Sequence, residues 1–146
     1  MPVINRSALL PFPASTVYDI VNDVSRYPDF LPWCAEAQVL EASETEVVAQ
    51  LALHSKGITE RFTTRNLLMP HERIELRLIS GPFRELSGVW TFVRLGRDEG
   101  CKVNLMLQFE FTGARALLGG AFSSVFVRAA DRLVDAFCDR ARALLG

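Results

Sequence analysis

The sequence has no hydrophobic run long enough to cross a membrane. Its two longest uncharged stretches, residues 7–18 and 116–127, contain twelve residues each, whereas a membrane-spanning helix needs about 20 apolar residues. A secretory signal is also missing, because Pro11 and Pro13 interrupt the apolar segment that follows Arg6. These absences predict a cytoplasmic protein, with peripheral contact at the inner membrane as the alternative.

Cysteine and histidine are scarce, which weakens metal and redox interpretations. The three cysteines, Cys34, Cys101 and Cys138, form no C-x-x-C pair, and the two histidines, His54 and His71, stand alone. We therefore expect no metal and no cofactor. The thiols are expected to be buried hydrophobes in a reducing compartment.

An excess of basic charge and the common catalytic motifs are missing as well. Sixteen basic and seventeen acidic side chains leave a net charge of −1, so we expect no DNA partner held by overall charge, although a local basic patch is compatible with this balance. The sequence holds no P-loop, no G-x-G-x-x-G, no H-E-x-x-H and no Ser-His-Asp order. We expect a protein that is not an enzyme and has no catalytic residues.

Apolar residues are abundant instead, at 49% of the 146 residues, with ten phenylalanines. A chain of this length predicts a single domain, residues 1–146, that can bury about two thirds of its surface. A first strand is predicted at residues 3–10, and apolar and polar residues alternate between residues 35 and 111. Alternation with period two predicts antiparallel strands with one buried face. The alternating apolar residues are Ala35, Ala37 and Val39; Val47, Ala49, Leu51 and Leu53; Ile58 and Phe62; Ile74, Leu76 and Leu78; Leu86, Trp90 and Phe92; and Val103, Leu105, Leu107, Phe109 and Phe111.

Helical spacing of apolar residues flanks this region on both sides. Residues 14–24 predict a helix, with Thr16 and Asp19 resembling a capping box, and two prolines limit residues 27–33 to short turns. Residues 114–145 predict one long amphipathic helix, bent near its start by two glycines. Its apolar stripe consists of Leu118, Phe122, Val125, Ala129, Leu133, Phe137, Ala141 and Leu144.

The order of these elements predicts an α+β protein with a helix-grip fold. A curved antiparallel sheet of about seven strands wraps around the long C-terminal helix, with two short helices after the first strand. The last helix is the only predicted element long enough to cover the concave face. A curved sheet that one helix cannot fill leaves an apolar cavity, unless the protein's own phenylalanines occupy that space.

Several segments resemble the START-like superfamily of polyketide cyclases, dehydrases and lipid transport proteins. The most specific is VNDVSRYPDFLPWC at residues 21–34, followed in order by FTTRN at 62–66, GPF at 81–83, WTF at 90–92 and FEFT at 109–112. The pattern is most similar to the branch that contains coenzyme-Q-binding proteins and the bacterial ribosome association toxin. The resemblance implies a START-like domain that binds ubiquinone or a related lipid without catalysis, as a chaperone or carrier in respiration. For the toxin branch it implies action on the association of ribosomal subunits.

The cavity implied by this resemblance suggests a set of ligand-binding residues. Tyr27, Phe30 and Trp33 are candidates for its mouth, because flat rings stack on a quinone head. A quinone carbonyl also needs a hydrogen-bond donor, which Tyr27, Trp33, Trp90 or Asn66 could supply. For any single wall candidate, ordinary core packing is the favoured interpretation, whereas the set as a whole is the only apolar surface available to an isoprenoid tail. The predicted walls are Leu51, Leu53, Phe62, Trp90, Phe92, Leu107, Phe109, Phe122, Val125 and Phe126.

Two other functions remain open at this point. A factor that binds the large ribosomal subunit would use a basic patch, for which Arg61, Arg65, Arg73 and Arg77 are candidates. A small polyketide cyclase or aromatase would need a buried acid or base. Glu60 has the strand parity of an inward side chain, where burial would raise its pKa, but a place at the wet rim of the sheet is the favoured interpretation.

The uncharged stretch at residues 116–127 suggests transient contact with a membrane while a lipid exchanges. Gly119 and Gly120 could act there as a hinge, and Arg115 and Arg128 flank the stretch. The alternative is a helix start that packs on the sheet, where glycine permits close approach.

Overall fold

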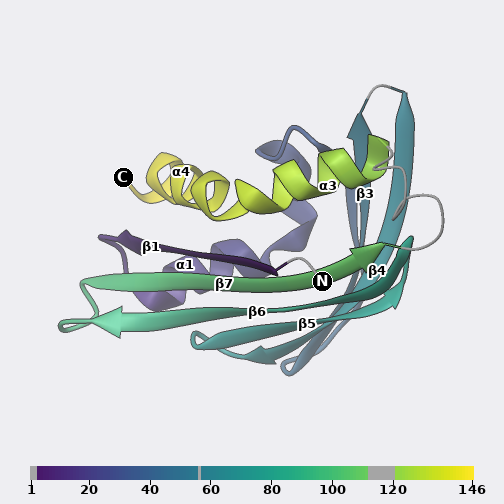
Figure 1. Ribbon diagram of the computed structural model, residues 1–146. Coiled ribbons are helices and arrows are strands. Elements are labelled where there is room, and N and C mark those ends of the chain that lie inside the picture. Colours follow the sequence, from purple (N-terminus) through teal and green to yellow (C-terminus); the bar gives the residue numbers. More distant parts are fainter. Residues whose placement is uncertain (1–2, 56, 112–120) are drawn as a thin grey trace.

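Seven antiparallel strands form one sheet in the described part of the chain (Figure 1). The computed structural model describes residues 3–55, 57–111 and 121–146. The strand order is β1-β7-β6-β5-β4-β3-β2, so the first strand pairs with the last. The predicted curved antiparallel sheet is confirmed. The strands are β1 (Val3–Leu10), β2 (Cys34–Ala42), β3 (Glu46–Ser55), β4 (Ile58–Met69), β5 (Arg73–Ser80), β6 (Phe83–Leu95) and β7 (Gly100–Phe111).

The helices lie on the concave side of this sheet. Figure 1 shows α3 and α4 running one after the other along that side, while β3 and β4 curl upward beside α3. Helix α1 packs against β6, β7 and α4. The core therefore lies between the inner face of the sheet and these helices, as a helix grip requires. The helical segments described are α1 (Ala14–Asn22), the 3-10 helix η1 (Val24–Asp29), α3 (Ala121–Asp131) and α4 (Leu133–Leu145).

The inner face of the sheet follows from the alternation in the sequence. Along β7, every second residue from Cys101 to Phe109 is buried, whereas the residues between them are exposed or half-buried. The register places Leu105 beside Trp90 and Leu107 beside Gly88. A Cβ atom at Gly88 would lie 2.8 Å from Leu107 Cδ1, so glycine lets this leucine lie close over the neighbouring strand.

The region after β1 differs from the prediction in two details. Helix α1 ends at Asn22 rather than at residue 24, because Asp23 leaves the helical conformation with φ −83° and ψ 68°. The predicted capping box is wrong, since α1 has no side-chain cap and Thr16 Oγ1 donates to the Pro13 carbonyl at 2.7 Å. The predicted short turns are confirmed as η1, which contains Pro28.

Strand β2 breaks the alternation that predicted a buried Val39. This side chain is 39% exposed. Strand β2 lies at the edge of the sheet, and its pairing with β3 shifts register between Cys34 and Glu36 and again between Val39 and Glu41. Val39 nevertheless pairs with Ala49 of the inner face, so it keeps the predicted face and is exposed because β2 is the edge strand.

The C-terminal helix is divided at a position that the sequence did not indicate. Arg132, with φ −104° and ψ 4°, separates α3 from α4, whereas the glycines expected to bend the helix lie outside the described residues. The change of direction keeps apolar residues of both helices on the curved sheet. Leu144, predicted on the buried stripe, is 54% exposed because it lies in the last turn of α4. The buried residues of α3 and α4 include Phe126, Ala129, Ala130, Val134, Phe137, Cys138 and Ala141.

Candidate functional site

An apolar cavity of about 90 Å³ lies between the inner face of the sheet and helix α3. Strands β3 to β7 provide most of its walls, and α3, η1, the segment before β2 and the start of α4 provide the rest. We call it the inner cavity. It is lined by Val24, Tyr27, Trp33, Ala49, Leu51, Leu53, Phe62, Thr64, Asn66, Leu76, Leu86, Trp90, Leu105, Leu107, Phe126, Ala129, Ala130 and Leu133.

Most of the predicted ligand-binding residues line this cavity, although their role in binding remains a prediction. The predicted residues found in its wall are Tyr27, Trp33, Leu51, Leu53, Phe62, Trp90, Leu107 and Phe126. Those that do not line it are Phe30, Phe92, Phe109 and Val125. The side chain of Phe122 lies outside the described residues.

Neighbouring rings separate three of the predicted phenylalanines from the inner cavity. The Phe92 ring packs edge-on against Tyr18, with centroids 5.4 Å apart. The Phe109 ring is covered by Phe126, at 5.0 Å. Phe30 packs against α4 rather than the cavity, and the Arg140 guanidinium lies 5.0 Å from its centroid. Their strand or turn positions were predicted correctly, but the partners that cover them come from distant parts of the chain.

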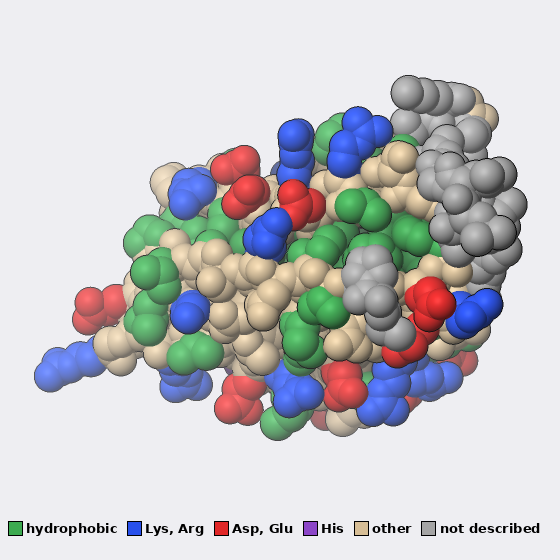
Figure 2. All heavy atoms as spheres, in the orientation of Figure 1, with side chains coloured by type: hydrophobic (Ala, Val, Ile, Leu, Met, Phe, Trp, Pro, Cys, Tyr) green, Lys and Arg blue, Asp and Glu red, His purple; other side chains and the backbone are tan. Residues whose placement is uncertain are grey.

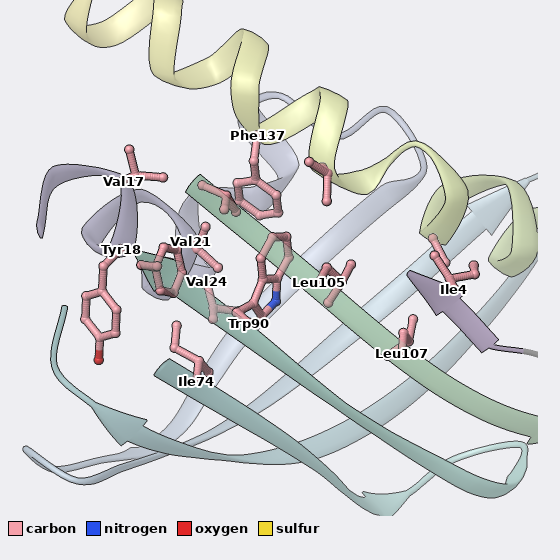
Figure 3. Packing of buried hydrophobic residues seen from close by; sticks show 14 of the residues in the cluster. Ile4, Val17, Tyr18, Val21, Val24, Ile74, Trp90, Leu105, Leu107 and Phe137 are labelled. Carbon is pink, nitrogen blue, oxygen red and sulfur yellow. The ribbon is translucent and has the colours of Figure 1, made fainter. Parts of the chain in front are cut away.

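The protein's own aromatic rings fill much of the interior. Figure 3 shows Trp90 rising from the sheet toward Phe137 of α4, where the two ring centroids lie 5.3 Å apart. At the other end, Phe83 packs against Phe62 and Phe126. The remaining 90 Å³ is smaller than the roughly 150 Å³ cavity that holds benzene in another protein. A ligand with a ring and a tail would therefore have to displace side chains.

A second, wider space lies outside the inner cavity, and we call it the outer groove. It measures about 610 Å³ and runs along α3 and α4 beside the start of β2. Trp33 and Ala129 line both spaces, so they form the wall between them. The other residues of the groove are Pro32, His54, Val125, Arg128, Arg132, Asp135, Ala136 and Asp139.

The Tyr27 hydroxyl is not available to a ligand. It donates to the Val21 carbonyl, and the ring packs against Phe30 and Phe137. Burial raises the pKa of this hydroxyl well above its usual range, with smaller contributions from Cys34 and Asp23. Tyr27 is therefore a structural support of the cavity mouth, and the interpretation of its hydroxyl as a ligand donor is wrong.

Several residues of the cavity wall were not predicted from the sequence. Ala49 and Leu76 were already placed on the inner parity of their strands. Only their position near the cavity under α3 distinguishes them from the other inner-face residues. That position depends on the curl of the sheet, which no local pattern encodes. The lining residues not predicted as wall are Val24, Ala49, Thr64, Asn66, Leu76, Leu86, Leu105, Ala129, Ala130 and Leu133.

Glu60, the candidate acid, lies on the inner face but does not line the cavity. It pairs with Leu53 across β3 and β4 and is half-buried. The described lining residues include no carboxylate, histidine, lysine or arginine. The inner cavity can therefore exclude water and surround apolar groups, but its walls supply no ordinary acid or base.

The four arginines of the predicted basic patch lie on the outer face, each beside a glutamate. Arg65 and Arg77 are neighbours across β4 and β5. Figure 2 shows blue and red side chains intermingled along the lower surface of the molecule. The outer face therefore carries charges of both signs. The ion pairs are Arg61–Glu36 (3.0 Å), Arg65–Glu46 (3.0 Å), Arg77–Glu75 (3.0 Å) and Arg73–Glu75 (3.8 Å).

The described residues contain no cluster of three or more His, Cys, Asp or Glu side chains suited to a metal ion. None of the helices in that part of the chain is long and apolar enough to span a membrane.

Comparisons with known proteins agree with this architecture. Residues 10–138 match the family described as polyketide cyclase / dehydrase and lipid transport. The Pseudomonas aeruginosa protein named "Ribosome association toxin RatA" is 50% identical over 143 residues, covering 98% of this chain and 97% of the relative. The Xenopus laevis "Coenzyme Q-binding protein COQ10 homolog B, mitochondrial" is 30% identical over 146 residues, covering 97% of this chain and 59% of the relative.

A solved structure shows the same fold. The crystal structure of the Zhui aromatase/cyclase from Streptomyces sp. R1128 superposes with a TM-score of 0.81 at 21% identity, covering 97% of this chain and 93% of the other. Similarity at this level of identity establishes a common architecture and leaves the chemistry to the residues of each site.

Proposed function

Because the chain belongs to the polyketide cyclase / dehydrase and lipid transport family, we propose that it binds a hydrophobic ligand in the inner cavity without converting it. The observation that carries this proposal is the composition of the cavity wall, which is almost entirely apolar and has no ordinary acid or base among its described residues. Ubiquinone or a related polyprenyl lipid is the proposed ligand, and the protein acts as its carrier or chaperone in respiration.

Binding requires the wall between the two spaces to move. The inner cavity of about 90 Å³ is too small for a substituted ring, whereas the outer groove of about 610 Å³ is large enough. Displacement of Trp33 would join the two spaces, because this side chain faces both. The ring of the ligand then occupies the inner cavity, and its tail follows the groove along α3.

Ligand extraction tests this proposal directly. Protein purified from its native cells is extracted with organic solvent, and the extract is analysed by mass spectrometry. We expect a quinone or another neutral lipid in stoichiometric amounts, and saturable binding of a short-chain ubiquinone to the emptied protein. An extract without lipid, together with no binding of the supplied quinone, contradicts the proposal.

The control is a variant with a filled cavity. Ala49 is 3% exposed and lines the inner cavity, so Ala49→Leu occupies part of the space with its own side chain. Ala35→Leu, at an exposed position of β2, adds the same atoms outside the cavity. We expect weaker quinone binding only in Ala49→Leu.

A second candidate function is association with the large ribosomal subunit. The relative at 50% identity carries the name "Ribosome association toxin RatA", which favours this candidate more directly than it favours a quinone. The arginines of the outer face can contact RNA phosphates. Their exposed ion pairs with glutamates contribute little to stability, so exchanging a glutamate for a phosphate costs little free energy. The two functions use different faces and are compatible.

Co-sedimentation tests the ribosomal candidate. We expect binding to isolated large subunits that weakens with added salt and is reduced by the double variant Arg65→Glu, Arg77→Glu on the outer face. Arg26→Glu in η1 is a charge reversal elsewhere on the surface, matched to each of the single variants Arg65→Glu and Arg77→Glu. Binding that is absent at low salt, or reduced equally by all these reversals, contradicts a specific outer-face interaction.

A further inference from the structure

Two polar side chains on β4 interrupt the apolar wall of the inner cavity. Thr64 and Asn66 are two residues apart, so both point to the inner face. Asn66 is 6% exposed, and Thr64 Oγ1 lies 2.9 Å from Asn66 Oδ1 as its hydrogen-bond donor. Both side chains line the inner cavity. A buried polar pair in such a setting is costly unless something satisfies it.

This pair carries more donor hydrogens than it uses. The amide has two N–H hydrogens and the hydroxyl has one, while the contact between them occupies only one. Turning the amide round reverses the direction of the bond but leaves the same surplus of donors. In either orientation, Thr64 and Asn66 offer N–H or O–H groups to the space that they line.

Trp90 adds a donor to the same wall. Its indole Nε1 can only donate, and its side chain is 2% exposed and lines the same cavity. Asn66 pairs with Leu76 of β5, and Leu76 pairs with Gly88 of β6, two residues before Trp90. The Cα positions of Asn66 and Trp90 therefore lie about two strand spacings and two residues apart, roughly 12 Å, in a single apolar wall.

The absence of charged side chains in the described wall limits which ligands the cavity can accept. The described lining residues contain no cationic side chain, so nothing compensates a buried carboxylate or phosphate. A pure hydrocarbon leaves the donors unsatisfied. A carbonyl oxygen accepts a hydrogen bond and carries no net charge, so it meets both conditions.

We propose that Asn66, positioned by Thr64, is a specificity-determining residue that selects neutral ligands with a carbonyl oxygen, such as ketones, quinones or esters. This inference rests on the proposed function, because it names the ligand class for the same cavity. The Asn66 amide donates to the carbonyl, Thr64 fixes the amide plane, and the surrounding leucines contact the hydrocarbon.

A pair of matched probes tests the selection. The probes are 2-propionylnaphthalene, which has a carbonyl, and 2-propylnaphthalene, which lacks it. Affinities are measured for the wild type, Asn66→Leu and Thr64→Val, with Leu76→Met as a control that changes the same wall but keeps the polar pair. The readout is the ratio of the two affinities within each protein, which cancels the different partitioning of the probes from water.

We expect the ketone-to-hydrocarbon ratio to fall about 3- to 10-fold in Asn66→Leu, to fall less in Thr64→Val, and to stay unchanged in Leu76→Met. Circular dichroism and urea unfolding establish that each variant folds, and Thr64→Val alone suffices if Asn66→Leu does not. Binding of both probes with an unchanged ratio in the variants overturns the role of Asn66 only. Binding of neither probe to the wild type overturns the proposed function as well.

Discussion

Trp33 and Ala129 each line both the inner cavity and the outer groove, so together they separate the two spaces. Trp33 comes from the segment between η1 and β2, whereas Ala129 comes from α3. The separation of a small apolar cavity from a wide groove therefore depends on one large, half-buried ring and one small side chain. The ring can move out without breaking the helix, because it belongs to the connecting segment.

Substitution of Trp33 tests this wall. Trp33→Ala joins the two spaces, so we expect the association rate of 2-propionylnaphthalene to rise several-fold in stopped-flow fluorescence. The half-buried ring also packs against the core, so the free energy of unfolding falls by about 1–3 kcal/mol. Ala129→Phe has the opposite effect on the rate, since it thickens the same wall. An unchanged association rate in both variants contradicts the interpretation of Trp33 and Ala129 as the wall between the two spaces.

A pair of neighbouring residues on β7 tests the inner face of the sheet. Leu105 is completely buried and lines the cavity, whereas Met106 is 40% exposed on the outer face. Leu105→Ala should lower the free energy of unfolding by about 2–5 kcal/mol, and Met106→Ala should change it by about 0.5 kcal/mol or less. Urea denaturation measures both. Similar losses in the two variants contradict the predicted alternation.

Two buried thiols predict an alkaline loss of stability. Burial raises the pKa of Cys34 and of Cys101 from 9.0 to about 11. The unfolded chain releases each proton near pH 9 and the folded chain near pH 11, so the folded state binds more protons between these values. Its stability is therefore complete below pH 9 and falls as pH rises toward 11, by up to about 1.4 kcal/mol per pH unit for each thiol.

Cys101→Ala isolates one of these contributions. We expect the free energy of unfolding to fall less steeply between pH 9 and pH 11 in the variant than in the wild type, whatever its value at neutral pH. The same slope in both proteins contradicts a raised pKa at Cys101. Slow alkylation of the native thiols at pH 8 is a second expected sign of their burial.

The alternation of apolar residues was sufficient to predict the sheet, because each side chain's face depends only on strand parity. It failed at Val39 only in burial. This residue pairs with Ala49 on the inner face, but β2 is the edge strand, and strand parity does not show where the covering elements end. The division of the last helix at Arg132 was also not predicted, because residues 128–136 contain no glycine or proline.

The cavity itself was only partly predictable from the sequence. Phe92 and Phe109 lie on the inner face, as their parity required, but Tyr18 and Phe126 cover them from other elements. Thr64 shares that face and lines the space instead. Which inner-face residues stay uncovered depends on contacts between distant segments, and these contacts are determined by the complete fold.

The most direct test of ligand binding in the inner cavity uses Trp90 as its reporter. The chain has two tryptophans, so Trp33→Phe leaves Trp90 as the only one, with 2% exposure and a place in the cavity wall. Titration with a short-chain ubiquinone should quench its fluorescence to saturation, and the addition of Ala49→Leu should weaken that binding strongly. Quenching that never saturates, or that is the same with and without Ala49→Leu, would show that the quinone does not bind in this cavity.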